Sequence, residues 1–157
     1  IMETTLNPVD LRILKLLQAN ARISNADIAR EVNMAPSAVL ERVKKLEQKK
    51  VIKQYNTAID SSSVGQRLLA FIFIKSKEGF TCSSETAASL AAIPEVQEVH
   101  HIAGEDCFLV KVRTADSASL MSLMRNSLQK IPNILSTKTT IVLETVKEDQ
   151  QLVIPGK

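Results

Sequence analysis

The sequence predicts an α+β protein in two parts, an N-terminal winged helix-turn-helix domain and a C-terminal ferredoxin-like βαββαβ domain. Three observations predict it. Residues 1–60 combine helical periodicity with turn signals at helix-turn-helix spacing. Residues 61–65 are small and polar, which marks a linker. Residues 66–157 alternate strand-like and helix-like segments in the order of the ferredoxin-like split.

Two helices are predicted before the corner of the helix-turn-helix. Asn7 suits an N-cap, and Pro8 suits the first helical position, where no N–H is needed. This first helix ends near Asn20, and its broad apolar face consists of Leu11, Ile13, Leu14 and Leu17. Ser24 and Asp27 then open a short second helix with a spacing close to that of a capping box.

A tight corner and a third helix follow. The corner is Asn33-Met34-Ala35, where Asn tolerates the positive φ that such a turn often needs. Pro36 suits the first turn of the third helix. Val39, Val43 and Leu46 recur at i, i+4 and i+7 and form one apolar stripe. Two short helices joined in this way predict a helix-turn-helix.

The opposite face of the third helix starts small and polar and ends basic, which predicts entry into a DNA major groove. The residues expected to face base edges are Ser37, Ala38 and Glu41. Those expected mainly to contact phosphates are Arg42, Lys44, Lys45, Lys50 and Lys53. Residues 1–60 hold ten Lys and Arg against seven Asp and Glu, whereas residues 61–157 hold ten of each. The excess positive charge therefore lies with the helix pair, although an ordinary solvated basic face is the alternative interpretation.

The segment after the third helix, residues 49–60, is β-prone and is predicted to form a small wing. The second part then follows. Its predicted elements are a central strand at 68–74, a helix at 83–92, strands at 96–102 and 107–113, a helix from Asp116 to Lys130 and a last strand at 134–146. They make one antiparallel sheet with both helices on one face. The richly apolar strands predict that another subunit covers the other face.

At this point the chain resembles a known family, the Lrp/AsnC (feast/famine) transcriptional regulators. The resemblance is carried by Leu40-Glu-Arg-Val-Lys-Lys-Leu-Glu47, Asn20-Ala-Arg22, the Gly104 turn and Ser136-Thr-Lys-Thr-Thr-Ile-Val-Leu-Glu144, and it covers nearly the whole chain. It implies a regulator that binds double-stranded DNA as a homodimer, often assembled into octamers. It also implies a small effector, typically an amino acid, bound between subunits.

The effector is predicted to bind at the hairpin turn. A backbone without Cβ at Gly104 lets a ligand come close, exposed N–H groups suit a carboxylate, and Glu105 or Asp106 suits an ammonium group. The predicted residues are His101, Ile102, Ala103, Gly104, Glu105, Asp106 and Cys107, with Ser136 and Thr139 from the last strand. An ordinary solvated β-turn is the alternative.

Two residues depart from the family pattern. Ala35 stands where the family usually has the capping Ser before the proline, and Cys107 stands where it has an Asp. We therefore expect either a preference for a less basic amino acid or no effector at all.

Several other classes are not supported by the sequence. No apolar run approaches the ~20 residues of a membrane helix, and no signal peptide opens the chain. Cys82 and Cys107 form no CxxC pattern and predict neither a disulfide framework nor a zinc site, which fits a reducing cytoplasm. His100 and His101 are adjacent on a strand and should face opposite sides, which disfavours a shared metal. We expect no cofactor and no enzymatic activity, and a cytoplasmic, nucleoid-associated protein.

Two other functions are left open by the sequence. One is a small-molecule-binding or enzymatic ferredoxin-like protein whose helical half mediates assembly. The other is an architectural protein that compacts DNA. Binding to the region upstream of the protein's own gene would separate these possibilities from a transcriptional regulator.

Overall fold

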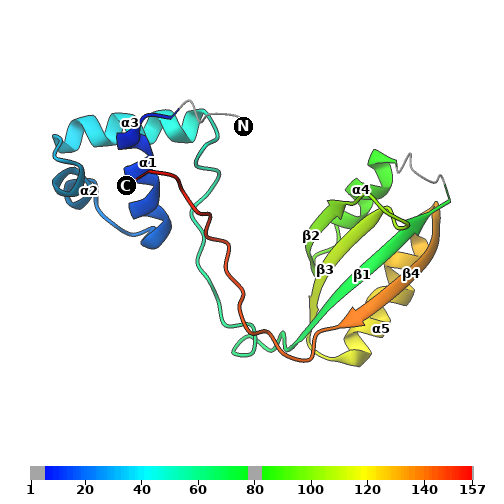
Figure 1. Ribbon diagram of the computed structural model, residues 1–157. Coiled ribbons are helices and arrows are strands. Elements are labelled where there is room, and N and C mark those ends of the chain that lie inside the picture. Colours follow the sequence, from blue (N-terminus) through cyan, green and yellow to red (C-terminus); the bar gives the residue numbers. More distant parts are fainter. Residues whose placement is uncertain (1–5, 78–82, 157) are drawn as a thin grey trace. The chain divides into compact units, whose positions relative to one another are not determined.

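The computed structural model describes residues 6–77 and 83–156, which form two compact units (Figure 1). Among these residues, the first unit extends to Ala58 and includes the chain again from Glu148 onward. The second unit runs from Ile59 to Lys147. The last residues of the chain therefore contact the helical unit, whereas the sequence predicts a single second domain that runs to the end.

The helical unit packs three helices around one small apolar core. These are α1 (Pro8–Ala19), α2 (Asn25–Val32) and α3 (Pro36–Gln48). Each contributes one side chain that is fully buried, namely Ile13, Ile28 and Val39. Helices this short are marginal alone in water, so the packing of their apolar stripes holds the unit together.

Local signals fix where these helices start and stop, as the sequence predicts. The Asn7 side chain accepts a hydrogen bond from the Asp10 N–H at 2.9 Å and caps α1. Asn33 ends α2 in the left-handed region, with φ of 54° and ψ of 51°. Ala35 occupies the N-cap of α3 and supplies no side-chain hydrogen bond. The predicted corner and the predicted loss of a cap are both confirmed.

The second unit has the predicted βαββαβ order. Its described elements are β1 (Leu68–Ser76), α4 (Ser84–Ala91), β2 (Val96–His101), β3 (Phe108–Thr114), α5 (Ser117–Asn126) and β4 (Ile134–Ile141). The strands lie in the order β2-β3-β1-β4, and every neighbouring pair is antiparallel. With β1 and β3 in the centre, this is the ferredoxin-like sheet.

The two faces of the sheet have different surroundings. Ile72 of β1 and Val110 of β3 are fully buried, and they share a core with Leu90 of α4 and Leu123 of α5. Both helices therefore cover the same face. Phe71 and Phe73, which alternate with these buried residues of β1, point to the opposite face and are only half-buried.

Three predicted elements differ from the structure. Residues 49–60 contain no strand, because this stretch has no neighbouring strand to share its N–H and C=O groups. Helix α5 ends at Asn126, and a separate 3₁₀ turn covers Leu128–Lys130. Strand β4 ends at Ile141, opposite Ala70, rather than at residue 146.

The predicted linker is an ordered turn. The N–H of Gln66 donates to the carbonyl of Ser61 at 2.8 Å, and Gly65 takes a positive φ of 77°. The Arg113 guanidinium of β3 donates to the Ser61 hydroxyl at 2.9 Å. Residues 61–65 are therefore anchored to the sheet unit by a side chain that is distant in sequence.

The C-terminal residues 148–156 belong to the helical unit, where they contact α1 (Figure 1). The Gln18 side-chain amide accepts from the Leu152 N–H at 2.9 Å and donates to the Leu152 carbonyl at 2.8 Å. The Lys15 ammonium donates to the carbonyl of Gly156. No helix in the described ranges is long and apolar enough to span a membrane.

Candidate nucleic-acid interface and effector region

Helix α3 presents a polar face to solvent. Val39, Val43 and Leu46 are buried against the other helices. The predicted base-facing residues Ser37 and Glu41 are exposed, whereas Ala38 is half-buried. The other exposed residues of α3 that follow Glu41 are Lys44, Lys45 and Gln48. The helix therefore exposes the small-to-basic face that the sequence predicts.

The start of α3 is open to a ligand. Ala35 and Pro36 are exposed, and no side chain caps the first N–H groups of the helix. The Met34 N–H donates to the Ala29 carbonyl at 2.9 Å, which closes the left-handed turn at Asn33. Pro36 has no N–H and the Ala38 N–H donates to the Ala35 carbonyl, so the Ser37 N–H and the helix dipole are what favour an anion such as a phosphate at this end.

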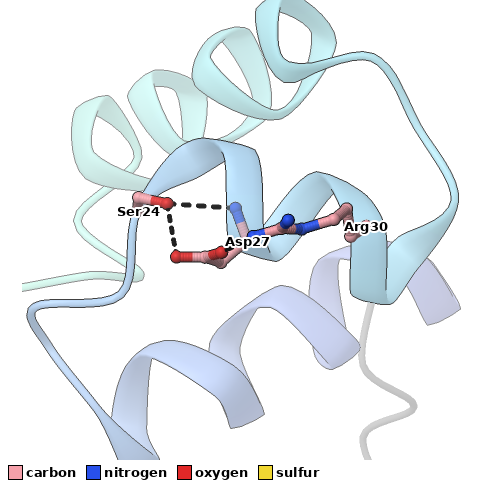
Figure 2. A network of polar contacts seen from close by, with 3 residues as sticks. All are labelled: Ser24, Asp27 and Arg30. Carbon is pink, nitrogen blue, oxygen red and sulfur yellow. Dashed lines mark hydrogen bonds and ion pairs between the residues drawn. The ribbon is translucent and has the colours of Figure 1, made fainter.

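A polar network caps the start of α2 (Figure 2). The Ser24 hydroxyl accepts from the Asp27 N–H at 3.0 Å and donates to the Asp27 carboxylate at 2.6 Å. Arg30, one turn further on, pairs with the same carboxylate. The Ser24 hydroxyl, followed by Arg30, lowers the pKa of Asp27 below its ordinary 3.8. Asp27 is thus a charged residue that stabilises the first turn of α2.

Arg42 has a different position from that predicted. Its guanidinium lies 2.9 Å from the Asp10 carboxylate of α1, and the two side chains are only 31% and 17% exposed. The pair joins α1 to α3 inside the helical unit. This geometry favours a role in fixing the recognition helix over the predicted phosphate contact, because a bridging guanidinium has fewer donors left for DNA.

Two further pairs involve α3. Lys45 lies 3.0 Å from Glu41 one turn earlier, and both side chains are well exposed, so DNA can displace the pair easily. The Tyr55 hydroxyl donates to the Glu47 carboxylate at 2.8 Å. Partial burial, followed by Glu47, raises the pKa of Tyr55 to about 12. This bond holds the chain after α3, where the exposed Lys50 and Lys53 lie.

One exposed residue of the candidate interface was not predicted from the sequence. Leu40 is 41% exposed and lies on the surface between Ser37 and Lys44, one turn from each. The sequence could have indicated its exposure, since Leu40 falls outside the buried stripe of Val39, Val43 and Leu46. An exposed apolar residue on a recognition helix suits contact with a thymine methyl group.

Seven of the predicted effector residues, 101–107, run from the end of β2 through the β2–β3 hairpin. The Ile102 N–H donates to the Cys107 carbonyl at 3.0 Å and closes the hairpin. Gly104 has a φ of 158°, and a Cβ built there would meet no atom within 4 Å. Ala103 and Glu105 are exposed and Asp106 is half-buried. The turn therefore offers backbone groups and two carboxylates at an open surface.

Cys107 differs from the prediction that the cysteines form no disulfide. It is disulfide-bonded and only 5% exposed, and its bonding partner lies outside the described residues, as does Cys82. Sequence spacing misled here because a disulfide needs only that two sulfurs meet in the fold. The buried sulfur offers no free thiol to an effector.

The two residues predicted from β4 do not lie together. Thr139 pairs with Ile72 in the sheet, and its hydroxyl contacts the Met124 sulfur at 3.6 Å, so it faces the helices. Ser136, three residues earlier, faces the other side and pairs with Lys75 near the hairpin end of β1. Only Ser136 can join a site on the uncovered face.

His100 and His101 face opposite sides of β2, as predicted. His100 shares a face with Glu98, whose carboxylate lies 3.0 Å from its ring nitrogen and 3.4 Å from the Lys111 ammonium. His100, followed by Lys111, lowers the pKa of Glu98. His101 instead lies beside the Phe108 ring, with 5.5 Å between the ring centroids. The His101 ring therefore packs beside an aromatic ring of β3 where the hairpin begins.

An exposed recognition helix on a three-helix unit, joined to a ferredoxin-like sheet with an open hairpin, defines a two-unit DNA-binding regulator. Comparison with known families agrees with this class. Residues 6–53 match the winged helix-turn-helix DNA-binding model, and residues 69–152 match the Lrp/AsnC ligand binding domain. The chain belongs to the Lrp/AsnC family of transcriptional regulators.

Relatives of known identity cover almost the whole chain. It is 35% identical to the leucine-responsive regulatory protein of Haemophilus influenzae, over 95% of this chain and 90% of that protein. It is 36% identical to the HTH-type transcriptional regulator FL11 of Pyrococcus horikoshii, over 98% and 99%. A Neisseria meningitidis transcriptional regulator solved in complex with L-Met has a TM-score of 0.86 and 28% identity, over 95% and 97%. These likenesses confirm the predicted family and fold.

Proposed function

We propose that this regulator binds duplex DNA by inserting α3 into the major groove. The exposed face of α3 carries the proposal, because its small start and basic end match a groove-facing helix. In this proposal, the residues that face base edges are Ser37, Ala38, Leu40 and Glu41. Lys44, Lys45, Lys50 and Lys53 contact phosphates, and Arg42 holds α3 against α1.

A gel-shift titration against the region upstream of the protein's own gene tests this proposal. Binding should weaken steeply as salt increases, because each neutralised phosphate releases counterions and adds ~0.9 to the slope of log K against log salt. Lys45→Ala should weaken binding about equally on all sequences. A bulky side chain at Ser37 should instead change the preference between operators, by ~1–3 kcal/mol per lost base contact. Binding that ignores salt, or no binding to any duplex, contradicts the proposal.

We further propose that the open face of the sheet joins two copies of the chain. Phe71, Phe73 and Leu109 form a half-buried apolar centre on this face, and the Lys138 ammonium lies 5.4 Å from the Phe73 ring centroid. A two-fold dimer places two recognition helices on one side of the duplex and implies a roughly palindromic operator. Four such dimers form the proposed octamer. Light scattering that finds a stable monomer at micromolar concentration contradicts both steps.

The proposed effector is an amino acid held by the β2–β3 hairpin. The backbone N–H groups around Gly104 suit its carboxylate, and Glu105 or Asp106 suits its ammonium group. The proposal is supported by the match of residues 69–152 to a ligand-binding domain. Calorimetry against the standard amino acids tests it, with Glu105→Gln as a charge-only variant. Binding that survives Gly104→Val unchanged places the pocket elsewhere.

The location proposed for such a regulator is the cytoplasm, in association with the nucleoid. This follows from the proposed duplex contacts, since a protein that reads operators must reach the chromosome. Fluorescence microscopy of a tagged full-length chain should show the signal over DNA, and a signal confined to the cell envelope contradicts it.

A further inference from the structure

We propose that α1 carries a docking site for the chain's own C-terminal segment, residues 148–156, and that this docking gives the helical unit a second connection to β4, held at α1 by hydrogen bonds. The described residues of this segment cluster with the helical unit rather than with the sheet that precedes them in sequence. The chain connects the two units first between α3 and β1. It connects them again between β4 and the docked segment.

At Leu152, docking uses the backbone of the segment. The Gln18 amide pairs with both the N–H and the carbonyl of Leu152, at 2.9 and 2.8 Å, as a neighbouring β-strand would. The side chains of Leu152 and Val153 are 75% and 99% exposed, so they contribute little. The Gln18 side chain therefore binds the backbone at Leu152, and this contact does not depend on which side chain stands there.

The end of the segment is held at a second point. Gly156 takes a positive φ of 98°, which favours glycine, and its carbonyl accepts from the Lys15 ammonium. A Cβ placed on Gly156 would lie 3.9 Å from a methyl group of Leu11. Two points one helical turn apart on α1 thus fix the direction of the segment.

The regulatory meaning of this docking rests on the function proposed above. A displacement of β4 on effector binding reaches α1 through only the six residues 142–147 that precede the docked segment. A docked segment limits the separate motion of the two units, because it closes a second loop between them. A released segment leaves one connection, and the DNA-binding unit then moves more freely.

Amide hydrogen exchange of the full chain tests the docking. The Leu152 amide should be protected in the wild type and should exchange at least tenfold faster in Gln18→Ala. Gln151→Ala is the matched control, since it removes the same side chain from the adjacent exposed position and should leave protection unchanged. The Ile13 amide reports whether α1 itself stays folded. An unprotected Leu152 amide in the wild type, or no acceleration in Gln18→Ala, overturns the proposal.

Nuclear spin relaxation of the same variants tests whether the docked segment connects the two units a second time. In Gln18→Ala the amides of α3 should show a shorter correlation time than in the wild type and in Gln151→Ala. An unchanged correlation time overturns the proposed connection between the two units. Protection of the Leu152 amide that disappears when dimers are diluted to monomers overturns docking within one chain, because the segment then binds α1 of the partner subunit. Neither measurement uses DNA or an effector. A failed gel shift therefore overturns the proposed function alone, and an unprotected Leu152 amide overturns the docking alone.

Discussion

For Arg42, the sequence predicts a phosphate contact, whereas the fold shows an ion pair with Asp10. As a phosphate contact, it should affect DNA binding and leave stability unchanged. As the partner of Asp10, 2.9 Å away, it should affect the stability of the helical unit. Arg42→Met tests this, because Met keeps most of the apolar stem and removes the charge.

The expected magnitude follows from the burial of the pair. Exposed ion pairs contribute about 0.2–1 kcal/mol, and breaking a buried pair costs about 3–5 kcal/mol. Side chains that are 31% and 17% exposed lie between these limits, so we expect Arg42→Met to lower the free energy of unfolding of the helical unit by about 1–2 kcal/mol. The folded-to-unfolded ratio then falls by roughly 5–30-fold.

Native-state amide exchange at Val39 and Val43 measures this change in the full chain, because both residues lie in the core of the unit. Lys44→Met is the matched control on the exposed face of α3. It should leave exchange unchanged and reduce the salt slope of DNA binding by ~0.9. The reasoning is refuted if Arg42→Met reduces the salt slope by that amount and leaves exchange unchanged.

Three other predictions concern the two folded units. Asn33→Gly should leave the stability of the helical unit within a few tenths of a kcal/mol, whereas Asn33→Val should cost about 1–2 kcal/mol or more at φ 54°, as measured by urea unfolding. Ile72→Ala should destabilise the sheet unit by about 2–5 kcal/mol, because Ile72 is fully buried, and its thermal transition should fall accordingly. Because the pKa of Asp27 is lowered below 3.8, its contribution to α2 is complete above that pH and is lost as the pH falls through the folded-state pKa. In a circular dichroism titration with acid, Asp27→Asn should remove the part of the loss of helix that comes from protonation of Asp27.

The helical unit was predictable because its signals are local. The Asn7 cap and the left-handed Asn33 are each read from a few neighbouring residues, and the structure has both. The pairing of Arg42 with Asp10 joins residues 32 apart, and that of Gln18 with Leu152 joins residues 134 apart. No periodicity predicts such contacts, because they depend on how the helices and the chain end pack.

The effector region shows a different kind of error. Ser136 and Thr139 were assigned to one site although they lie three residues apart on a strand, which places them on opposite faces. The alternation of the strand was sufficient to exclude one of them. The disulfide of Cys107, by contrast, depends on packing that the sequence pattern does not reveal.

The contact of residues 148–156 with α1 can form only late in synthesis, because these residues are made long after α1. The core of the helical unit contains no residue beyond Ile52, so this unit can fold long before residues 148–156 are made. At about 5–20 residues per second, the hundred or so residues between Ile52 and Leu152 take roughly 5–20 s to appear. During that interval the helical unit can be folded while Gln18 and Lys15 of α1 still lack their partners Leu152 and Gly156. The helical unit of a newly made chain therefore folds first without the docked segment.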